Sequence, residues 1–312
     1  MLAYCAKRIG QALIVLVGVS LITFLLLNVI PGDPVALMLD KNASPQAIAN
    51  LRHEWGLDRP LGQQYVSFVF NAARGNLGNS YFEKTPVLEM LVNGLSATLK
   101  LGGIAFIFSG LIGIVLGTLA AMFRGRGLDH ALMVTAMLGI SLPVFWIAIV
   151  LQIVFGLKLR WLPISGVKTM LGYVLPVIAL GSTYAGSMAR LVRTSVLEEL
   201  SQDYVKTAHS KGLHGAAVMI RHVLRNAAIP VVTLSGTQIK SILTGSMIIE
   251  SIFSIAGIGR IAVSAIMVRD IPVIQGTVLY TAALFILINL AIDLLYGIID
   301  PKISVSKSLS VG

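Results

Sequence analysis

The stretch Asp203-Tyr-Val-Lys-Thr-Ala-His-Ser-Lys-Gly-Leu213, followed by His222-Val-Leu-Arg-Asn-Ala-Ala-Ile-Pro230, is a polar, basic segment in an otherwise apolar chain. Apolar residues recur at three- and four-residue spacing from Val196 to Ala208, which predicts an amphipathic helix. Gly212 interrupts this pattern, and a second short helix is predicted from about Gly215 to Leu224. The segment is expected to form a helix–glycine–helix elbow on a membrane surface, either as a solvated connector or as a surface for a partner.

The composition around this elbow indicates an all-α membrane protein. Of the 312 residues, 56% are hydrophobic and only 12% are charged, and the mean hydropathy is +0.85. A soluble domain carries about 25% charged residues. The chain has room for six helical spans of roughly 20 residues, each of which satisfies its own backbone hydrogen bonds in lipid. The predicted spans cover residues 9–30, 97–122, 131–155, 173–189, 227–249 and 274–299.

These spans divide the chain into four parts. They are an N-terminal tail and first span (1–30), an external segment (31–96), a membrane domain with a cytoplasmic loop at 190–226 (97–300), and a cytoplasmic tail (301–312). The short loops and the 190–226 loop carry many lysine and arginine residues. The longer external segments carry a similar number, but long loops count little in the positive-inside rule, which therefore predicts that both termini are cytoplasmic. The net charge of +10 is better explained by this orientation than by nucleic-acid binding.

Local signals refine this organisation. In the external segment, Pro31-Gly-Asp-Pro34 is predicted to end the first helix, residues 44–53 to form a capped helix, and residues 75–78 to form a turn. The first span exceeds a typical signal-peptide core and is expected to remain in the chain. The fourth span is short and carries several hydroxyl side chains, so it is expected to lie inside a helix bundle rather than against lipid.

Small and polar residues within the spans suggest packing and a pathway. Gly110, Gly113 and Gly117 are expected to allow close helix packing. Lys240 is an ionisable residue inside the fifth span, which makes a functional role the first hypothesis. A structural ion pair, or a side chain that extends to the membrane surface, is the alternative. The polar face predicted to line a water-filled pathway consists of Thr237, Gln238, Lys240, Ser241 and Thr244.

Several kinds of chemistry are not indicated by the sequence. It contains no G-x-x-x-x-G-K-[ST] phosphate-binding loop, so the chain is not expected to hydrolyse ATP. Energy for any transport by the chain must therefore come from a partner or an ion gradient. The five histidines do not have the spacing of a metal-ligand set, and Cys5 is the single cysteine. No catalytic residue, metal site or cofactor is expected in this chain.

The elbow carries a resemblance to a known family. Residues 206–212 resemble the Glu-Ala-Ala-x-x-x-Gly loop of the membrane subunits of bacterial ATP-binding-cassette (ABC) importers, and residues 203–213 are similar to the form Asp-Tyr-Val-x-Thr-Ala-x-x-Lys-Gly-Leu of the dipeptide, oligopeptide, glutathione and nickel permeases. Lys206 replaces the glutamate, and Ile255-Ala256-Gly257 stands where many relatives have Trp-Pro-Gly. The resemblance covers nearly the whole chain. Its other segments are residues 8–34, 56–61, 75–78, 222–233, 252–260, 269–275 and 289–293.

This resemblance implies a type I ABC importer permease fold in the bacterial inner membrane. The implied partners are a second, homologous permease subunit, two cytoplasmic ATPase subunits that carry ATP and Mg²⁺, and an extracytoplasmic solute-binding protein. The residues implied to couple to the ATPase are Asp203, Tyr204, Lys206, Thr207, Ala208, Lys211, Gly212, Leu213, Arg221 and Arg225. Small residues such as Ala208 and Gly212 would let the surface of the ATPase approach closely.

The implied function is ATP-driven import of di- or oligopeptides or similar small solutes, with nickel or a metal chelate as the alternative cargo. Two other classes of protein rank lower. An ion-coupled secondary transporter is disfavoured because no inverted repeat or broken helix is recognised in the sequence. An intramembrane enzyme is disfavoured because the sequence lacks paired aspartates, G-x-S-x-G and H-E-x-x-H.

Overall fold

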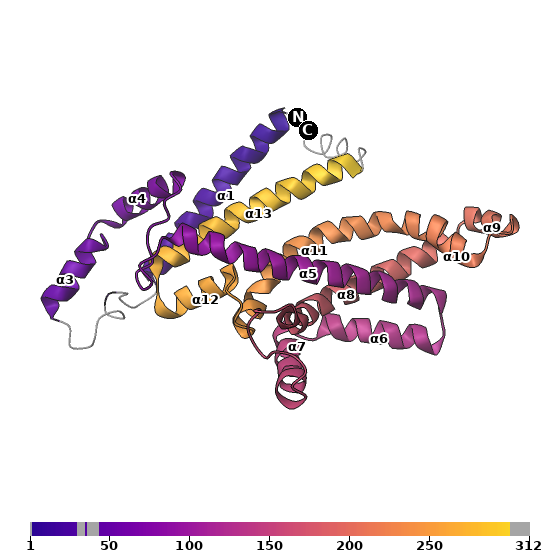
Figure 1. Ribbon diagram of the computed structural model, residues 1–312. Helices are drawn as coiled ribbons and strands as arrows, with labels where there is room; N and C mark the ends of the chain where they lie inside the picture. The colour runs from indigo at the N-terminus through magenta and orange to yellow at the C-terminus, as the bar shows by residue number, and fades with distance from the viewer. Residues whose placement is uncertain (1, 30–34, 36–43, 300–312) are drawn as a thin grey trace. The chain divides into compact units, whose positions relative to one another are not determined.

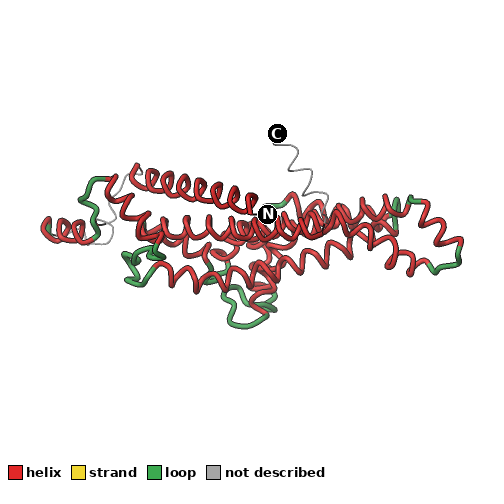
Figure 2. The backbone as a smooth tube through the Cα atoms, turned by 90° about the horizontal axis from the view of Figure 1, so that it is seen from above, coloured by secondary structure: helices red, strands yellow, loops and turns green. Residues whose placement is uncertain are grey.

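The computed structural model describes residues 2–29, 35 and 44–299, and within these residues every regular element is a helix (Figures 1 and 2). Five helices are long and apolar enough to cross a membrane. They are α1 (Leu2–Val29), α5 (Val87–Met122), α8 (Leu171–Leu200), α11 (Leu224–Ile252) and α13 (Ile271–Ile299). The remaining predicted span corresponds to a bent pair of helices. The predicted tail at 301–312 and the Pro31–Pro34 stop lie outside the described residues.

The bent pair covers the third predicted span, residues 131–155. It consists of α6 (Gly127–Ser141) and, after a bend of 105°, α7 (Val144–Leu151) continued by the π-helix η1 (Gln152–Lys158). The two helices together are apolar enough to form a sixth span, but they do not form one continuous helix. Pro143 causes the break, because its ring lacks an N–H and holds the preceding Leu142 in an extended conformation (φ −82°, ψ 135°).

Two compact units make up the chain. One comprises residues 1–97 and 256–298, and the other comprises residues 98–255 and 299–312. The first unit contains α1, α3 (Pro45–Glu54), α4 (Leu61–Ala73), the start of α5, α12 (Ile258–Val268) and α13. The second contains the rest of α5, α6 to α8, and α11 with the helical segments that precede it.

In the second unit, α8 is the central helix. More than half of its apolar stretch is buried (56%), against 33% for α5 and 17% for the α11 span, so the prediction that the fourth span lies inside a bundle is confirmed. The helix runs to Leu200, well past the predicted end at residue 189. No glycine or proline interrupts residues 190–200, and Val192 and Val196 continue the buried face.

Glycines allow α5 and α6 to approach α8 closely. A Cβ atom added at Gly113 would lie 2.4 Å from the Cβ of Met188, and one at Gly117 would lie 2.4 Å from the carbonyl oxygen of Ala189. On the other side of α8, a Cβ at Gly186 would lie 2.3 Å from the carbonyl oxygen of Ala136 in α6. The predicted packing role is thus confirmed within the chain for Gly113 and Gly117, whereas a Cβ at Gly110 would meet no atom within 4 Å.

We expect Gly117→Ala to lower the free energy of unfolding by about 1–3 kcal/mol, because the new methyl group must push α5 away from α8. Thermal unfolding of the purified protein in detergent would measure the loss. Gly110→Ala is the matched control, since its added Cβ meets no atom within 4 Å in the same helix. Equal effects of the two substitutions would contradict the packing argument.

In the first unit, two of the sequence predictions are confirmed. Ser44 caps α3, where its hydroxyl accepts a hydrogen bond from the backbone N–H of Ala47 at 3.2 Å. Gly75 and Gly78 adopt positive φ values of +79° and +81° in the predicted turn. Helices α4 and α12 were not predicted. The loop before α5 is fixed to the start of α13 by Asp270, whose buried carboxylate accepts hydrogen bonds from the Ser80 hydroxyl at 2.5 Å and the Tyr81 N–H at 3.2 Å.

Candidate functional site

The polar elbow lies between α8 and α11, at the same end of the second unit as the turn from α5 to α6 (Figure 1). It contains α9 (Asp203–Ser210), α10 (Gly215–Val218) and the π-helix η2 (Met219–Val223). The amphipathic helix predicted for residues 196–208 is divided, because residues 196–200 belong to α8 and a turn at 201–202 separates them from α9. The second predicted helix is present, but it continues without interruption into α11.

The inward face of α9 packs against its own chain. Val205 and Ala208 are 3% and 6% exposed and lie in one hydrophobic cluster with side chains of α8 and α11. Tyr204 is half-buried beside them, and its hydroxyl donates a hydrogen bond to Glu199 at 2.5 Å. Burial and this bond raise the pKa of Tyr204. The elbow is therefore held firmly on the two long helices that it joins.

Gly212 ends α9 in a Schellman motif. Its φ of +77° is in the left-handed region, its N–H bonds to the carbonyl of His209 at 2.9 Å, and the N–H of Leu213 bonds to the carbonyl of Ala208 at 3.3 Å. Glycine is favoured here because other L-residues are strained at positive φ. A Cβ at Gly212 would meet no atom within 4 Å, so the position is also open to a partner.

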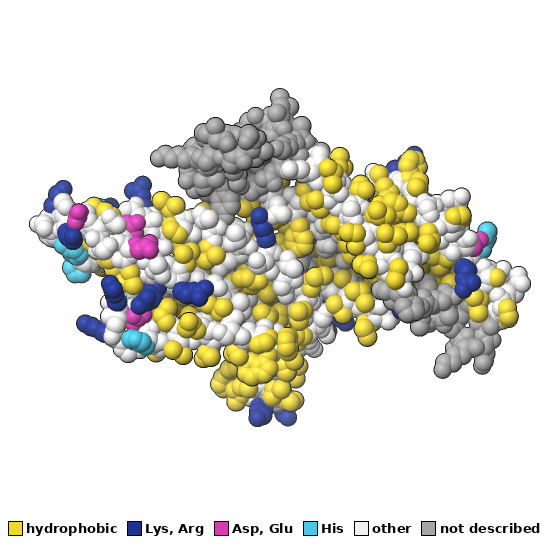
Figure 3. All heavy atoms as spheres, turned by 180° about the vertical axis from the view of Figure 1, so that it is seen from behind, with side chains coloured by type: hydrophobic (Ala, Val, Ile, Leu, Met, Phe, Trp, Pro, Cys, Tyr) yellow, Lys and Arg dark blue, Asp and Glu magenta, His cyan; other side chains and the backbone are white. Residues whose placement is uncertain are grey.

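The predicted coupling residues divide into two groups. Tyr204 and Ala208 face the cluster, so the small size of Ala208 serves packing within the chain and not the approach of a partner in this structure. The exposed members are Asp203, Lys206, Thr207, Lys211, Gly212, Leu213, Arg221 and Arg225. Charged side chains gather at this end of the second unit (Figure 3). The exposed ion pair of Lys206 with Asp203, at 2.8 Å, contributes little stability.

A buried ion pair supports the elbow from the adjacent helix. Asp129, near the start of α6, accepts two hydrogen bonds from Arg193 of α8: from Nε to Oδ1 at 2.7 Å and from Nη2 to Oδ2 at 2.8 Å. It also accepts the N–H of Gly125 at 2.9 Å. The side chain of Asp129 is only 4% exposed and that of Arg193 is 27% exposed. Two parallel bonds of this kind fix the relative position of α6 and α8 a short distance before the elbow.

The predicted pathway residues also divide. Thr237, Ser241 and Thr244 are exposed along one face of α11, with half-buried Lys240 beside them. Gln238 is 4% exposed and faces α8 instead, where its Nε2 donates to the carbonyl of Tyr184 at 3.0 Å. Gln238 therefore lies off the exposed stripe, and its predicted place in the pathway stays a prediction. The remaining residues form a polar stripe on a helix that is otherwise apolar enough to span a membrane.

Comparison with known families decides what kind of protein carries this arrangement. The family model described as "Binding-protein-dependent transport system inner membrane component" matches residues 113–305. The model described as "Binding-prot-dependent transport system membrane comp, N-term" matches residues 1–102. This chain belongs to the binding-protein-dependent permease family. It is a membrane component of a transport system that works with a binding protein, as the resemblance implied.

Individual relatives support the assignment of this permease. It is 39% identical to the di/tripeptide transport system permease protein DppB of Pseudomonas aeruginosa, over 97% of this chain and 99% of that protein. It is 37% identical to the dipeptide transport system permease protein DppB of Escherichia coli K12, over 98% of this chain and 100% of that protein. A solved structure of the inward-facing MetNI methionine ABC transporter matches with a TM-score of 0.58 and 17% identity, over 68% of this chain and 97% of that chain. That match confirms the predicted importer-permease fold.

Sequence reasoning found the elbow of this permease but missed its support. Asp129 and Arg193 are separated by 64 positions, and no periodic pattern connects them. Val205 and Ala208 are three residues apart in α9, so they lie on the same face of the helix, and both are buried. The period of α9 could therefore have assigned both residues to the inward face.

Proposed function

We propose that this permease imports di- and tripeptides, as one of two permease subunits driven by two cytoplasmic ATPase subunits and supplied by an extracytoplasmic binding protein. The relatives named above are described as peptide permeases, which favours peptides over nickel as the cargo. In this proposal the bacterial inner membrane holds the chain with both termini in the cytoplasm, and ATP and Mg²⁺ bind only to the partners.

The observation that carries the energy-coupling part of the proposal is the construction of the elbow. Its inward face is fixed in the cluster on α8 and α11, while its outward face presents Lys206, Lys211 and Leu213 to solvent. A force applied to this outward face would act directly on two membrane-spanning helices. A loosely attached connector would yield before it moved them. Exposed lysine and arginine at the rim would govern the rate and specificity of docking more than its affinity.

Uptake into vesicles tests the proposed function. The complete complex, reconstituted with its binding protein, should accumulate a labelled dipeptide only when ATP reaches the ATPase subunits. Omission of ATP or of the binding protein should each abolish uptake. Accumulation driven by a proton gradient without ATP would contradict the proposal and favour an ion-coupled transporter.

We infer that the polar stripe of α11 lines the pathway, because the ionisable side chain of Lys240 is costly against lipid. The hydroxyls of Thr237, Ser241 and Thr244 donate to carbonyls of their own helix and add polar oxygens to the same face. Ser241→Phe should therefore remove most of the dipeptide uptake, since a bulky ring would block the face while the helix stays intact. The ATPase should still copurify. Val232→Phe, an exposed position of α11 away from the stripe, is the control and should retain uptake. Equal uptake by the two variants would exclude this face from the pathway.

A further inference from the structure

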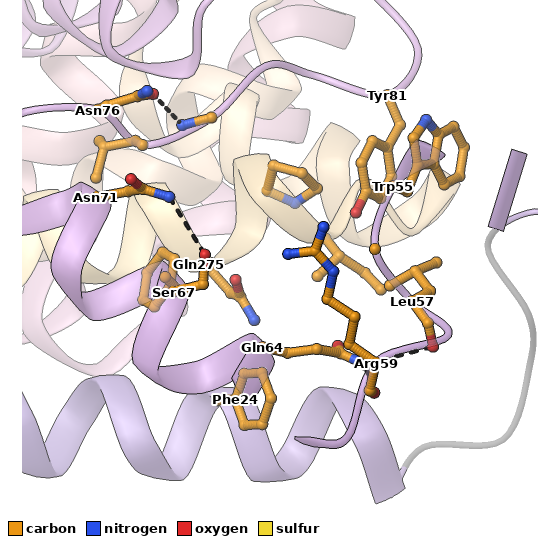
Figure 4. A pocket seen from close by; sticks show the side chains of 16 residues that line it. Phe24, Trp55, Leu57, Arg59, Gln64, Ser67, Asn71, Asn76, Tyr81 and Gln275 are labelled. Carbon is orange, nitrogen blue, oxygen red and sulfur yellow. Dashed lines mark hydrogen bonds between the residues drawn. The ribbon is translucent and has the colours of Figure 1, made fainter. Parts of the chain in front are cut away.

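A second candidate site lies in the first unit, well separated in sequence from the elbow. It is a cavity of about 190 Å³ between the end of α1, the turn from α3 to α4, α4, the loop before α5, and the first turns of α13 (Figure 4). The side chains that give it chemical character are Trp55, Arg59, Gln64, Asn71, Tyr81 and Gln275. The proposed energy coupling through the elbow does not involve this cavity.

Arg59 brings a positive charge to the cavity. Its side chain extends into the middle of the lining residues (Figure 4), and no aspartate or glutamate is among them. Among the residues that the structure describes, Arg59 forms no ion pair. The neighbouring carboxylate, Asp58, is engaged by Nδ1 of His53 at 2.6 Å. A guanidinium with free donors in a concave site suits a carboxylate, which it can bind through two parallel hydrogen bonds.

Gln275 supplies the second, independent observation. It is 8% exposed, its carboxamide points into the cavity (Figure 4), and no other group in the described part of the chain bonds to it. Its polar atoms face the open space of the cavity, so they are free to bond a molecule that enters it. With a donor and an acceptor, this amide can bind a peptide group or one oxygen of a carboxylate.

A flat aromatic wall completes the site. The rings of Trp55 and Tyr81 stack in parallel, with centroids 3.7 Å apart and an interplanar angle of 1°. The backbone of Tyr81 is fixed by its hydrogen bond to buried Asp270. Lys84 lies over the Trp55 ring at 5.8 Å from its centroid. The wall is thus a preformed surface against which an apolar side chain can pack.

We propose that this cavity binds the C-terminal residue of a short peptide. Arg59 holds the free carboxylate, Gln275 bonds the last peptide group, and the Trp55–Tyr81 wall contacts the side chain. A cavity of about 190 Å³ has room for one amino-acid residue. The inference rests on the proposed function, because it takes peptides to be the cargo.

Tryptophan fluorescence tests the site directly. The chain has three tryptophans, so Trp146→Phe and Trp161→Phe together leave Trp55 as the one tryptophan of this chain. A complex that also carries Trp55→Phe gives the background signal of the partner subunits, which is subtracted. The complete permease–ATPase complex, in lipid nanodiscs and without the binding protein, would be titrated with alanyl-phenylalanine and with its C-terminal amide. The free acid should give a saturable change. The amide and the Arg59→Gln variant should each bind at least about tenfold more weakly, because a charge-assisted pair is lost.

Arg74→Gln is the matched control. Arg74 is an exposed arginine of the same segment that lies over the Phe70 ring at 3.9 Å, outside the lining of the cavity. This variant should bind alanyl-phenylalanine normally. Because Arg59 is also exposed, Arg59→Gln should not impair folding, and equal thermal unfolding of the two variants would verify this.

The outcomes separate the two proposals. If vesicles take up dipeptide with ATP but the Trp55 signal does not change, or changes equally for acid and amide, the cavity proposal is overturned and the proposed function stands. If Arg59→Gln weakens association with the binding protein while no peptide binds, the cavity is a protein-docking site and the proposal is also overturned. Failure of dipeptide uptake by the parent complex would instead overturn the proposed function.

Discussion

Gly212→Val is expected to reduce copurification of the ATPase subunits with the permease by at least about tenfold. Gly212 holds φ at +77°, and a β-branched residue at positive φ is strongly disfavoured, at a cost of about 1–2 kcal/mol or more. The hydrogen bonds of the Schellman motif at the end of α9 would then be lost. The residues on the outward face of the elbow would be displaced. A change of about 1.4 kcal/mol in the free energy of docking corresponds to a tenfold change in affinity.

Two further variants separate backbone conformation from the mere presence of a side chain. Gly212→Asn should retain most of the association, because asparagine tolerates the left-handed region. Gly215→Val adds the same side chain three positions later, where φ is not positive and a Cβ meets no atom within 4 Å. It should also bind the ATPase normally. Measurement requires pull-down from membranes with the permease quantified in each sample. Normal association of Gly212→Val would show that the elbow is only a solvated connector.

The sequence allowed the positions of the long helices to be predicted because apolar length alone identifies a span. It did not reveal where they end. The start of α5 at Val87 and the end of α8 at Leu200 lie outside the apolar stretches, and amphipathic turns extend both helices beyond them. The break at Pro143 did have a visible signal, since proline in a long apolar run disfavours a straight helix.

The sites were predictable only in part. The exposed face of the elbow followed from its polar residues, whereas its inward face required knowledge of which helices it contacts. Contacts such as Ser80 with Asp270 join positions 190 residues apart, and a single sequence holds no periodic signal for them. The cavity around Arg59 is assembled from five separate segments, none of which carries a binding motif. Such sites become visible only when the segments are placed in space.

The buried pair of Asp129 and Arg193 leads to the largest expected effect on stability. Asp129→Ala should lower the free energy of unfolding by about 2–3 kcal/mol. Breaking a fully buried pair costs about 3–5 kcal/mol, and the smaller value reflects the 27% exposure of the Arg193 side chain. The substitution leaves the guanidinium without its carboxylate and the N–H of Gly125 without its acceptor. Chemical or thermal unfolding in detergent would measure the change.

Lys206→Ala is the control for this measurement, because it removes one partner of the exposed pair with Asp203. It should change the unfolding free energy by no more than about 0.5 kcal/mol. If the two substitutions destabilised the protein equally, the burial of Asp129 would not explain its contribution to the free energy of unfolding. The comparison isolates burial because both pairs have similar contact distances, 2.7 Å and 2.8 Å between nitrogen and oxygen.

The double variant Asp129→Leu with Arg193→Met then separates stability from energy coupling. Replacing a buried pair by apolar side chains of similar volume is often neutral for stability, so this variant should recover most of the loss. It cannot restore the two directional bonds that fix α6 on α8 just before the elbow. We therefore expect a folded complex that hydrolyses ATP but transports less dipeptide per ATP. Uptake and hydrolysis measured on the same vesicles would give this ratio, and an unchanged ratio would show that the pair serves stability alone.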